Sequence, residues 1–229
     1  ADGTTAVGYQ AGMNYVPADT GGSASGGTTL IGYNAGTDSS ATDHGLTTGL
    51  YNTAVGHQVF GAGAGDALTG DSNTVMGYRA GYAMVGDPDF NTLIGSEAGT
   101  KLTSGDYNTA LGWRALAYDG SSNLTGSSNT AIGFYAGQKL EGSGSENTFL
   151  GSYAGNAVTT GSDNVAIGYS SDCGATTTYQ AAIGAYAVTQ NNYETRVGYG
   201  GGFQFYSKSV VCDLGGAAEN DPAHATPIG

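Results

Sequence analysis

Charged residues are scarce in this sequence, and basic residues are the scarcest. Only 11% of the 229 residues are charged, and 6 Lys and Arg stand against 19 Asp and Glu, which gives a formal net charge of -13 at pH 7. Binding to nucleic acid requires clustered Lys and Arg for contacts to phosphates. We therefore expect no nucleic-acid partner.

Long apolar runs and cysteines are also rare. No run of about 18 apolar residues occurs, so we expect no membrane span. Cys173 and Cys212 are the only cysteines. They either form a disulfide or remain two unpaired thiols, and no Cys/His cluster predicts a zinc site. The sequence starts at Ala1 within a repeat and without an initiator Met, which indicates a portion of a longer polypeptide.

Glycine, by contrast, is abundant and recurs in a fixed phrase. The chain has 42 Gly without a Gly-X-Y period, which excludes collagen. The phrase is Asn-Thr-small-aliphatic-Gly-x-x-Ala-Gly, and it is found as TTAVGYQAG (4–12), TTLIGYNAG (28–36), NTVMGYRAG (73–81), NTLIGSEAG (91–99), NTAIGFYAG (129–137) and NTFLGSYAG (147–155). With looser copies included, the central glycines are Gly8, Gly32, Gly56, Gly77, Gly95, Gly112, Gly133, Gly151, Gly168, Gly184 and Gly198.

This repeat predicts the fold class. The phrase is constant while the spacing of the central glycines falls from 24 residues at the start of the array to 14 at its end, which is typical of a stacked solenoid with unequal loops. We expect an all-β fold, a parallel β-roll or β-solenoid of about eleven coils with variable loops, over residues 1–200. Residues 201–229 are predicted to form a C-terminal capping strand and a linker.

The residue before each central glycine is always large and apolar. These residues, which we call the aliphatic row, are Val7, Ile31, Val55, Met76, Ile94, Leu111, Ile132, Leu150, Ile167, Ile183 and Val197. We expect the aliphatic row to fill the core, and the residue before it, often Ala, to face the opposite side of the strand. Burial on both faces is expected where several solenoids pack around a common axis.

Other positions of the phrase also predict structural roles. Asn or Thr four residues before the glycine predicts a ladder of hydrogen bonds from coil to coil. The central glycines predict turns that need a positive φ or a close backbone approach. An aromatic residue or His follows the glycine in most copies: Tyr9, Tyr33, His57, Tyr78, Trp113, Phe134, Tyr169 and Tyr199. This aromatic row is interpreted either as packing between coils or chains, or as a set of platforms for carbohydrate.

Motifs for catalysis and metal binding are missing from the sequence. The three histidines, His44, His57 and His224, have no neighbouring nucleophile motif, so we expect no enzyme and no catalytic residues. The Asp pairs 38/43, 66/71 and 87/89 leave calcium open as an alternative, but the spacing of an EF-hand is absent. We expect no cofactor and no metal site.

The phrase resembles the head repeats of trimeric autotransporter adhesins and the related Gly-rich repeats of bacteriophage tail fibres. The resemblance covers about 200 of the 229 residues. It implies a left-handed parallel β-roll and a homotrimer in which three chains associate along a fibre axis. It also implies an extracellular location, on a virion tail or a cell surface. The chain departs from the adhesin pattern in its longer, unequal loops and in its lack of coiled-coil heptads.

From these observations we expect a structural fibre protein with an adhesive or receptor-binding role, for which a host or surface glycan is the expected ligand. The alternative is a self-assembling extracellular filament, joined head to tail by β-strand addition through residues 203–211. The longest loops lie in the first three repeats, where we predict receptor-binding residues: Tyr15, Asp19, Asp38, Asp43 and His44.

Overall fold

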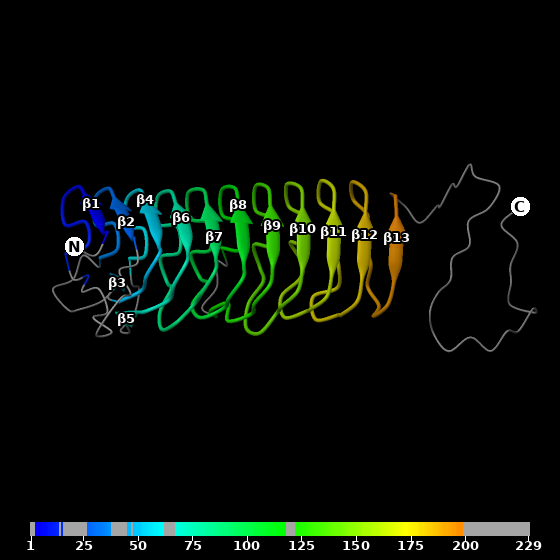
Figure 1. Cartoon of the computed structure of the whole chain (residues 1–229). Helices are drawn as coiled ribbons and strands as arrows, with labels where there is room; N and C mark the ends of the chain where they lie inside the picture. The colour runs from blue at the N-terminus through cyan, green and yellow to red at the C-terminus, as the bar shows by residue number, and fades with distance from the viewer. Residues whose placement is uncertain are drawn as a thin grey trace, which may run out of the picture.

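In the computed structural model, the chain forms an elongated rod in which each repeat contributes one short strand that pairs with the strand of the next repeat (Figure 1). The structure describes residues 3–13, 15, 27–37, 45–46, 48–61, 67–117 and 122–198. Over these ranges the chain contains no helix, and hence none that is long and apolar enough to cross a membrane. The predicted all-β parallel solenoid is confirmed.

Eleven strands form one parallel sheet in chain order. They are β1 (Thr5–Val7), β2 (Thr29–Ile31), β4 (Thr53–Val55), β6 (Thr74–Met76), β7 (Thr92–Ile94), β8 (Thr109–Leu111), β9 (Thr130–Ile132), β10 (Thr148–Leu150), β11 (Val165–Ile167), β12 (Ala181–Ile183) and β13 (Thr195–Val197). Strands β3 (Gly45–Leu46) and β5 (Ala67–Leu68) form a second parallel pair. Neighbouring strands pair in register, so that Ala131 lies opposite Phe149 and Ile132 opposite Leu150. Equivalent residues therefore form straight rows along the rod.

The strands end at the central glycines. All eleven have positive φ values, from 90° at Gly198 to 141° at Gly56. A Cβ added to Gly133 would lie 2.5 Å from the carbonyl oxygen of Gly151 in the next coil. Both physical reasons for glycine therefore apply at this position: the backbone conformation is one that other residues rarely adopt, and the space is taken by the next coil.

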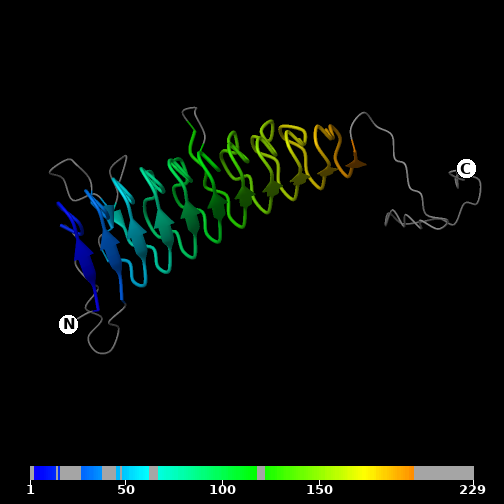
Figure 2. The same cartoon turned by 90° about the horizontal axis from the view of Figure 1, so that it is seen from above.

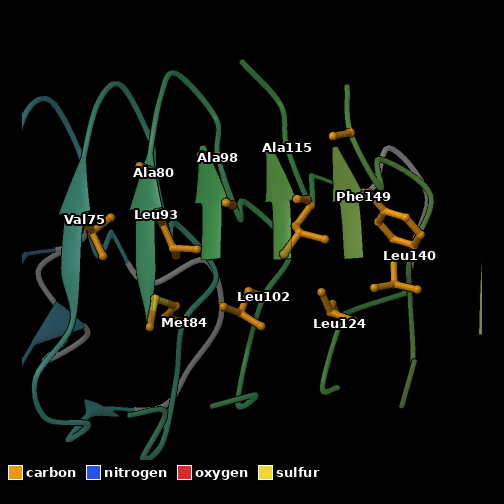
Figure 3. Packing of buried hydrophobic residues seen from close by; sticks show 14 of the residues in the cluster. Val75, Ala80, Met84, Leu93, Ala98, Leu102, Ala115, Leu124, Leu140 and Phe149 are labelled. Carbon is orange, nitrogen blue, oxygen red and sulfur yellow. The ribbon is translucent and has the colours of Figure 1, made fainter. Parts of the chain in front are cut away.

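The core is filled from two opposite walls. From β2 to β12 the middle residue of each sheet strand is buried, as for Val75, Leu93 and Phe149, and the connecting segments supply a second row of inward residues (Figure 3). The sheet contributes Leu30, Ala54, Val75, Leu93, Ala110, Ala131, Phe149, Ala166 and Ala182, and the opposite wall, which we call the back wall, contributes Leu46, Leu68, Met84, Leu102, Leu124, Leu140 and Val158; all are 0% exposed. The two rows form one continuous apolar cluster together with buried residues that follow the central glycines, such as Ala80, Ala98 and Ala115 (Figure 3).

The aliphatic row does not lie in this cluster, so the predicted face assignment is wrong for the single chain. Its side chains point outward: Leu111 and Leu150 are each 44% exposed, whereas their neighbours Ala110 and Phe149 are fully buried. The physical reason is volume. The interior between the two walls is narrow, and Leu and Met side chains from the back wall already fill it, so Ala suffices at most inward positions of the sheet.

Buried asparagines lie just before the strands, on the same side of the chain as the inward middle residues. Asn52, Asn73, Asn91, Asn108, Asn129, Asn147 and Asn164 are all 0% exposed, and each carboxamide bonds to the next coil or to its own. Gln180 takes the next position in this row, and its backbone N–H donates to Asn164 Oδ1 at 3.2 Å. The expected hydrogen-bonded ladder from coil to coil is present. It satisfies polar backbone groups that would otherwise be unpaired in the interior.

Candidate interaction surfaces

The outer sheet face carries the aliphatic row, and it is the most regular surface of the rod. Strands lie along one side of the rod, as the view from above shows (Figure 2). Each strand presents its first and third residues outward, so a row of mostly Thr runs beside the aliphatic row. Neither row contains a charged residue, although the chain has a net charge of -13. The face is uncharged and combines an apolar row with a row of mostly Thr, on a molecule that is acidic as a whole.

The aromatic row lies at the turn that follows this face, and its rings contact one another from coil to coil. Tyr9 and Tyr33 stack with centroids 5.2 Å apart, and His57 contacts both Tyr33 and Tyr78 edge to face. Further along, the Trp113 ring lies 5.0 Å from that of Phe134. Packing between coils is thus present in this row. A stacked ring also has one face covered, which leaves less of it for a sugar.

The predicted receptor residues divide into two groups. Tyr15 is half-buried, its ring packs against the core, and its hydroxyl lies 3.2 Å from Thr28 Oγ1 and 3.0 Å from the carbonyl oxygen of Gly49. These contacts give Tyr15 a structural role in the first coil, and its role as a receptor contact stays a prediction. Asp19, Asp38, Asp43 and His44 lie outside the described residues, as do Cys212, Tyr199 and the segment 201–229.

The acidic residues of the later connections have structural partners. Asp89 Oδ1 accepts a hydrogen bond from the backbone N–H of Asp71 at 2.6 Å, and Asp106 Oδ1 accepts one from the N–H of Asp89 at 2.9 Å. These carboxylates therefore tie one coil to the next. In the part of the chain that the structure describes, no three His, Cys, Asp or Glu side chains come together in a group suited to a metal ion.

The half-buried Asp172 and the buried Cys173 are neighbours near the C-terminal end of the array. Burial raises the pKa of the Asp172 carboxyl from 3.8 to about 6, although backbone N–H groups of Ala157 and Cys173 bond to it and act in the opposite direction. Burial also raises the pKa of the Cys173 thiol to about 11. The thiol is free and 1% exposed, so it belongs to the core of the rod.

A pocket that sequence reasoning missed lies over the back wall. Its volume is about 220 Å³, and it is lined by Arg79, Tyr82, Thr100, Lys101, Thr103 and Asn123 together with two small apolar side chains. Lys101 and Thr103 flank the inward Leu102, and Asn123 precedes the inward Leu124, so these residues face away from the core. The signal in the sequence is weak, because the lining residues come from three repeats with unequal spacing.

Comparisons of the chain with family models, with curated proteins and with solved structures gave no match.

Proposed function

We propose that this chain is a structural fibre protein whose copies associate side by side through the outer sheet face, three around a common axis. In this proposal the rod lies outside the cell, on a virion tail or a cell surface, and carries an adhesive or receptor-binding role without enzymatic activity. The observation that supports it most strongly is the outward aliphatic row, with one large apolar side chain for every strand of the sheet.

The exposed aliphatic row would be best covered by a partner whose apolar side chains repeat at the same spacing. The strands pair in register, so the side chains of the row follow one another at the strand separation of about 4.8 Å. A second copy of the same rod has this spacing along its whole length and can contact the row residue by residue. The absence of charge in the two outward rows removes the repulsion that two acidic copies would otherwise experience there.

The number of chains comes from the resemblance to trimeric adhesin heads and tail fibres, and it can be measured directly. We expect light scattering on the purified protein to give three times the chain mass of 22.8 kDa. Leu111→Asp places a charge in the centre of the row and should yield a folded monomer, because Leu111 is exposed in the single chain. Ser143→Asp, at an exposed residue outside the row, adds the same charge and should leave the assembly intact.

A monomeric parent protein would contradict lateral association and leave the head-to-tail filament as the remaining proposal. One feature is compatible with the filament: Ala6, at an inward position of β1, the first strand of the described sheet, is exposed. The other end opposes it. Arg196 takes the corresponding position in β13 and pairs with Glu194 at 2.9 Å, and stacking a coil on it would bury a charge. Ala6→Asp should abolish filaments and leave a lateral trimer unchanged.

A further inference from the structure

We propose that the pocket over the back wall, which Arg79 and Lys101 help to line, binds an acidic sugar, meaning a sugar unit that carries a carboxylate or a sulfate. This inference rests on the adhesive part of the proposed function and is independent of lateral association. Arg79 and Lys101 are two of only six basic residues in the chain. Two cations lining one small pocket on a molecule of net charge -13 are the feature to be explained.

The other basic residues that the structure describes have acidic neighbours. Arg114 Nε lies 3.0 Å from Glu97 Oε2, and Arg196 Nη2 lies 2.9 Å from Glu194 Oε1. Lys139 acts on the carboxylate of Asp172 and lowers its pKa. Within the described ranges, Arg79 and Lys101 have no such ion pair, and the buried Nε of Arg79 has no hydrogen-bond partner. Buried donors are almost always satisfied in proteins, so an unsatisfied guanidinium nitrogen beside a pocket favours an anionic ligand.

The arrangement also fixes the guanidinium in place. Arg79 Cζ lies 4.0 Å from the centroid of the Tyr82 ring, which is the distance of a cation–π contact. This contact leaves the N–H groups of the guanidinium able to donate. A planar fork of donors suits the two oxygens of a carboxylate or sulfate, and Lys101 adds a second positive charge.

The remaining lining favours a sugar over a bare ion. Asn123 is exposed and carries an amide that can bond to hydroxyl groups, and two small apolar side chains offer a surface for C–H groups. The volume of about 220 Å³ lies below the range of roughly 300–1,000 Å³ for drug-sized ligands, which suits a single sugar unit. Since the pocket lies away from the outer sheet face, copies that associate through that face would leave each pocket open.

Binding of four defined probes to the full chain tests this inference: glucuronic acid, glucose 6-sulfate, glucose and inorganic sulfate, each titrated by NMR or calorimetry. We expect both acidic sugars to bind and glucose to bind at least about tenfold more weakly. Inorganic sulfate that binds as well as glucose 6-sulfate would show an anion site without sugar recognition and would overturn the inference. Equal binding of glucose and glucuronic acid would also overturn it.

Two pocket variants and a charge-matched control complete the experiment. Arg79→Gln and Lys101→Gln should each weaken binding of glucuronic acid about tenfold or more, with unchanged circular dichroism. Lys139→Gln removes the same charge at an exposed residue that does not line the pocket, and it should bind as the parent does. Equal weakening in all three variants would indicate an effect of net charge alone and contradict the site. Binding of neutral glycans without acidic ones would contradict this inference while leaving the adhesive role in place.

Discussion

The carboxamide oxygen of Asn52 accepts two hydrogen bonds from Asn73 in the next repeat, one from its backbone N–H at 2.8 Å and one from its Nδ2 at 3.1 Å. Asn73 in turn offers its own oxygen to Asn91 in the same way. Each asparagine is therefore both the acceptor for one neighbour and the donor to another. Such a row is cooperative, because the loss of one member leaves polar groups unpaired on both sides.

The first prediction concerns the middle of this row. Asn129→Ala removes the acceptor for the N–H and Nδ2 of Asn147 and the donor to Asn108 Oδ1, all in the dry interior. We expect the free energy of unfolding to fall by at least about 2 kcal/mol, measured by chemical denaturation. Ser143→Ala, at an exposed position, is the control and should change it by less than about 0.5 kcal/mol. An Asn129→Ala variant as stable as the control would show that the row is dispensable.

The second prediction compares two glycines with positive φ. Gly133 has a φ of 137° and no room for a Cβ, whereas Gly86 has a φ of 70° and nothing within 4 Å of a Cβ. Gly86→Ala should cost about 1 kcal/mol from backbone strain alone. Gly133→Ala should cost more than about 2 kcal/mol, because the clash with Gly151 is added to the strain. Equal thermal midpoints for the two variants would rule out the close approach of successive coils.

The third prediction uses two adjacent residues of β10 that point in opposite directions. Phe149 is fully buried and Leu150 is 44% exposed. Phe149→Ala should destabilise each chain by about 3 to 5 kcal/mol, since it leaves a cavity between the walls. Leu150→Ala should leave the stability of an isolated chain nearly unchanged and weaken association between chains. The test is to measure both unfolding and mass for each variant. If Leu150→Ala lowers the stability of the isolated chain more than Phe149→Ala does, the assignment of the inward and outward faces is wrong.

The fourth prediction concerns pH. The pKa of Asp172 is about 6 in the folded chain, above its usual value of 3.8. Between these values the folded state binds more protons than the unfolded state, so this group contributes stability below about pH 4 that is lost as the pH rises through 6. The full difference amounts to about 3 kcal/mol at most. Asp172→Asn should therefore become more stable relative to the parent as the pH rises from 4 to 7.

The control for this titration is Asp163→Asn, which removes one carboxylate at another position of the array. Both variants remove one carboxylate, so a rise with pH that is confined to Asp172→Asn would assign the effect to Asp172. Denaturation midpoints at pH 4, 5, 6 and 7 supply the comparison. Parallel curves for Asp172→Asn and the parent would show that folding does not raise the pKa of this carboxyl.

The sequence was sufficient to predict the strands, their parallel order and the turns, because each of these follows from a local phrase. The side of the strand that faces inward was not predicted correctly, although the alternation of side chains along the phrase is enough to assign it. In Asn129-Thr130-Ala131-Ile132, the first and third residues share one side of the strand. Once Asn129 is assigned to a buried ladder, Ala131 must also point inward and Ile132 outward. The larger apolar residue is a misleading guide where both sides of a strand are apolar.

The back wall was not predicted, although part of it has a signal in the sequence. Met84 and Leu102 each follow their central glycine by seven residues, whereas Leu124 follows Gly112 by twelve because that connection is longer. The longer connections break the period, so the row was not recognised from the sequence. The pocket with Arg79 and Lys101 depends on the same irregular segments, so it becomes visible only when neighbouring coils are brought together in space.

The contact of each central glycine with the same glycine of the next coil makes the rod modular in length. Gly112 lies against Gly133, and Gly133 against Gly151, in the same geometry. Excision of one complete repeat, such as residues 113–133, brings Gly112 against Gly151 and restores an equivalent junction. Insertion of a repeat does the same. The length of such a rod can therefore change, in evolution or by engineering, in steps of one strand separation. The glycine at each contact between coils must be kept.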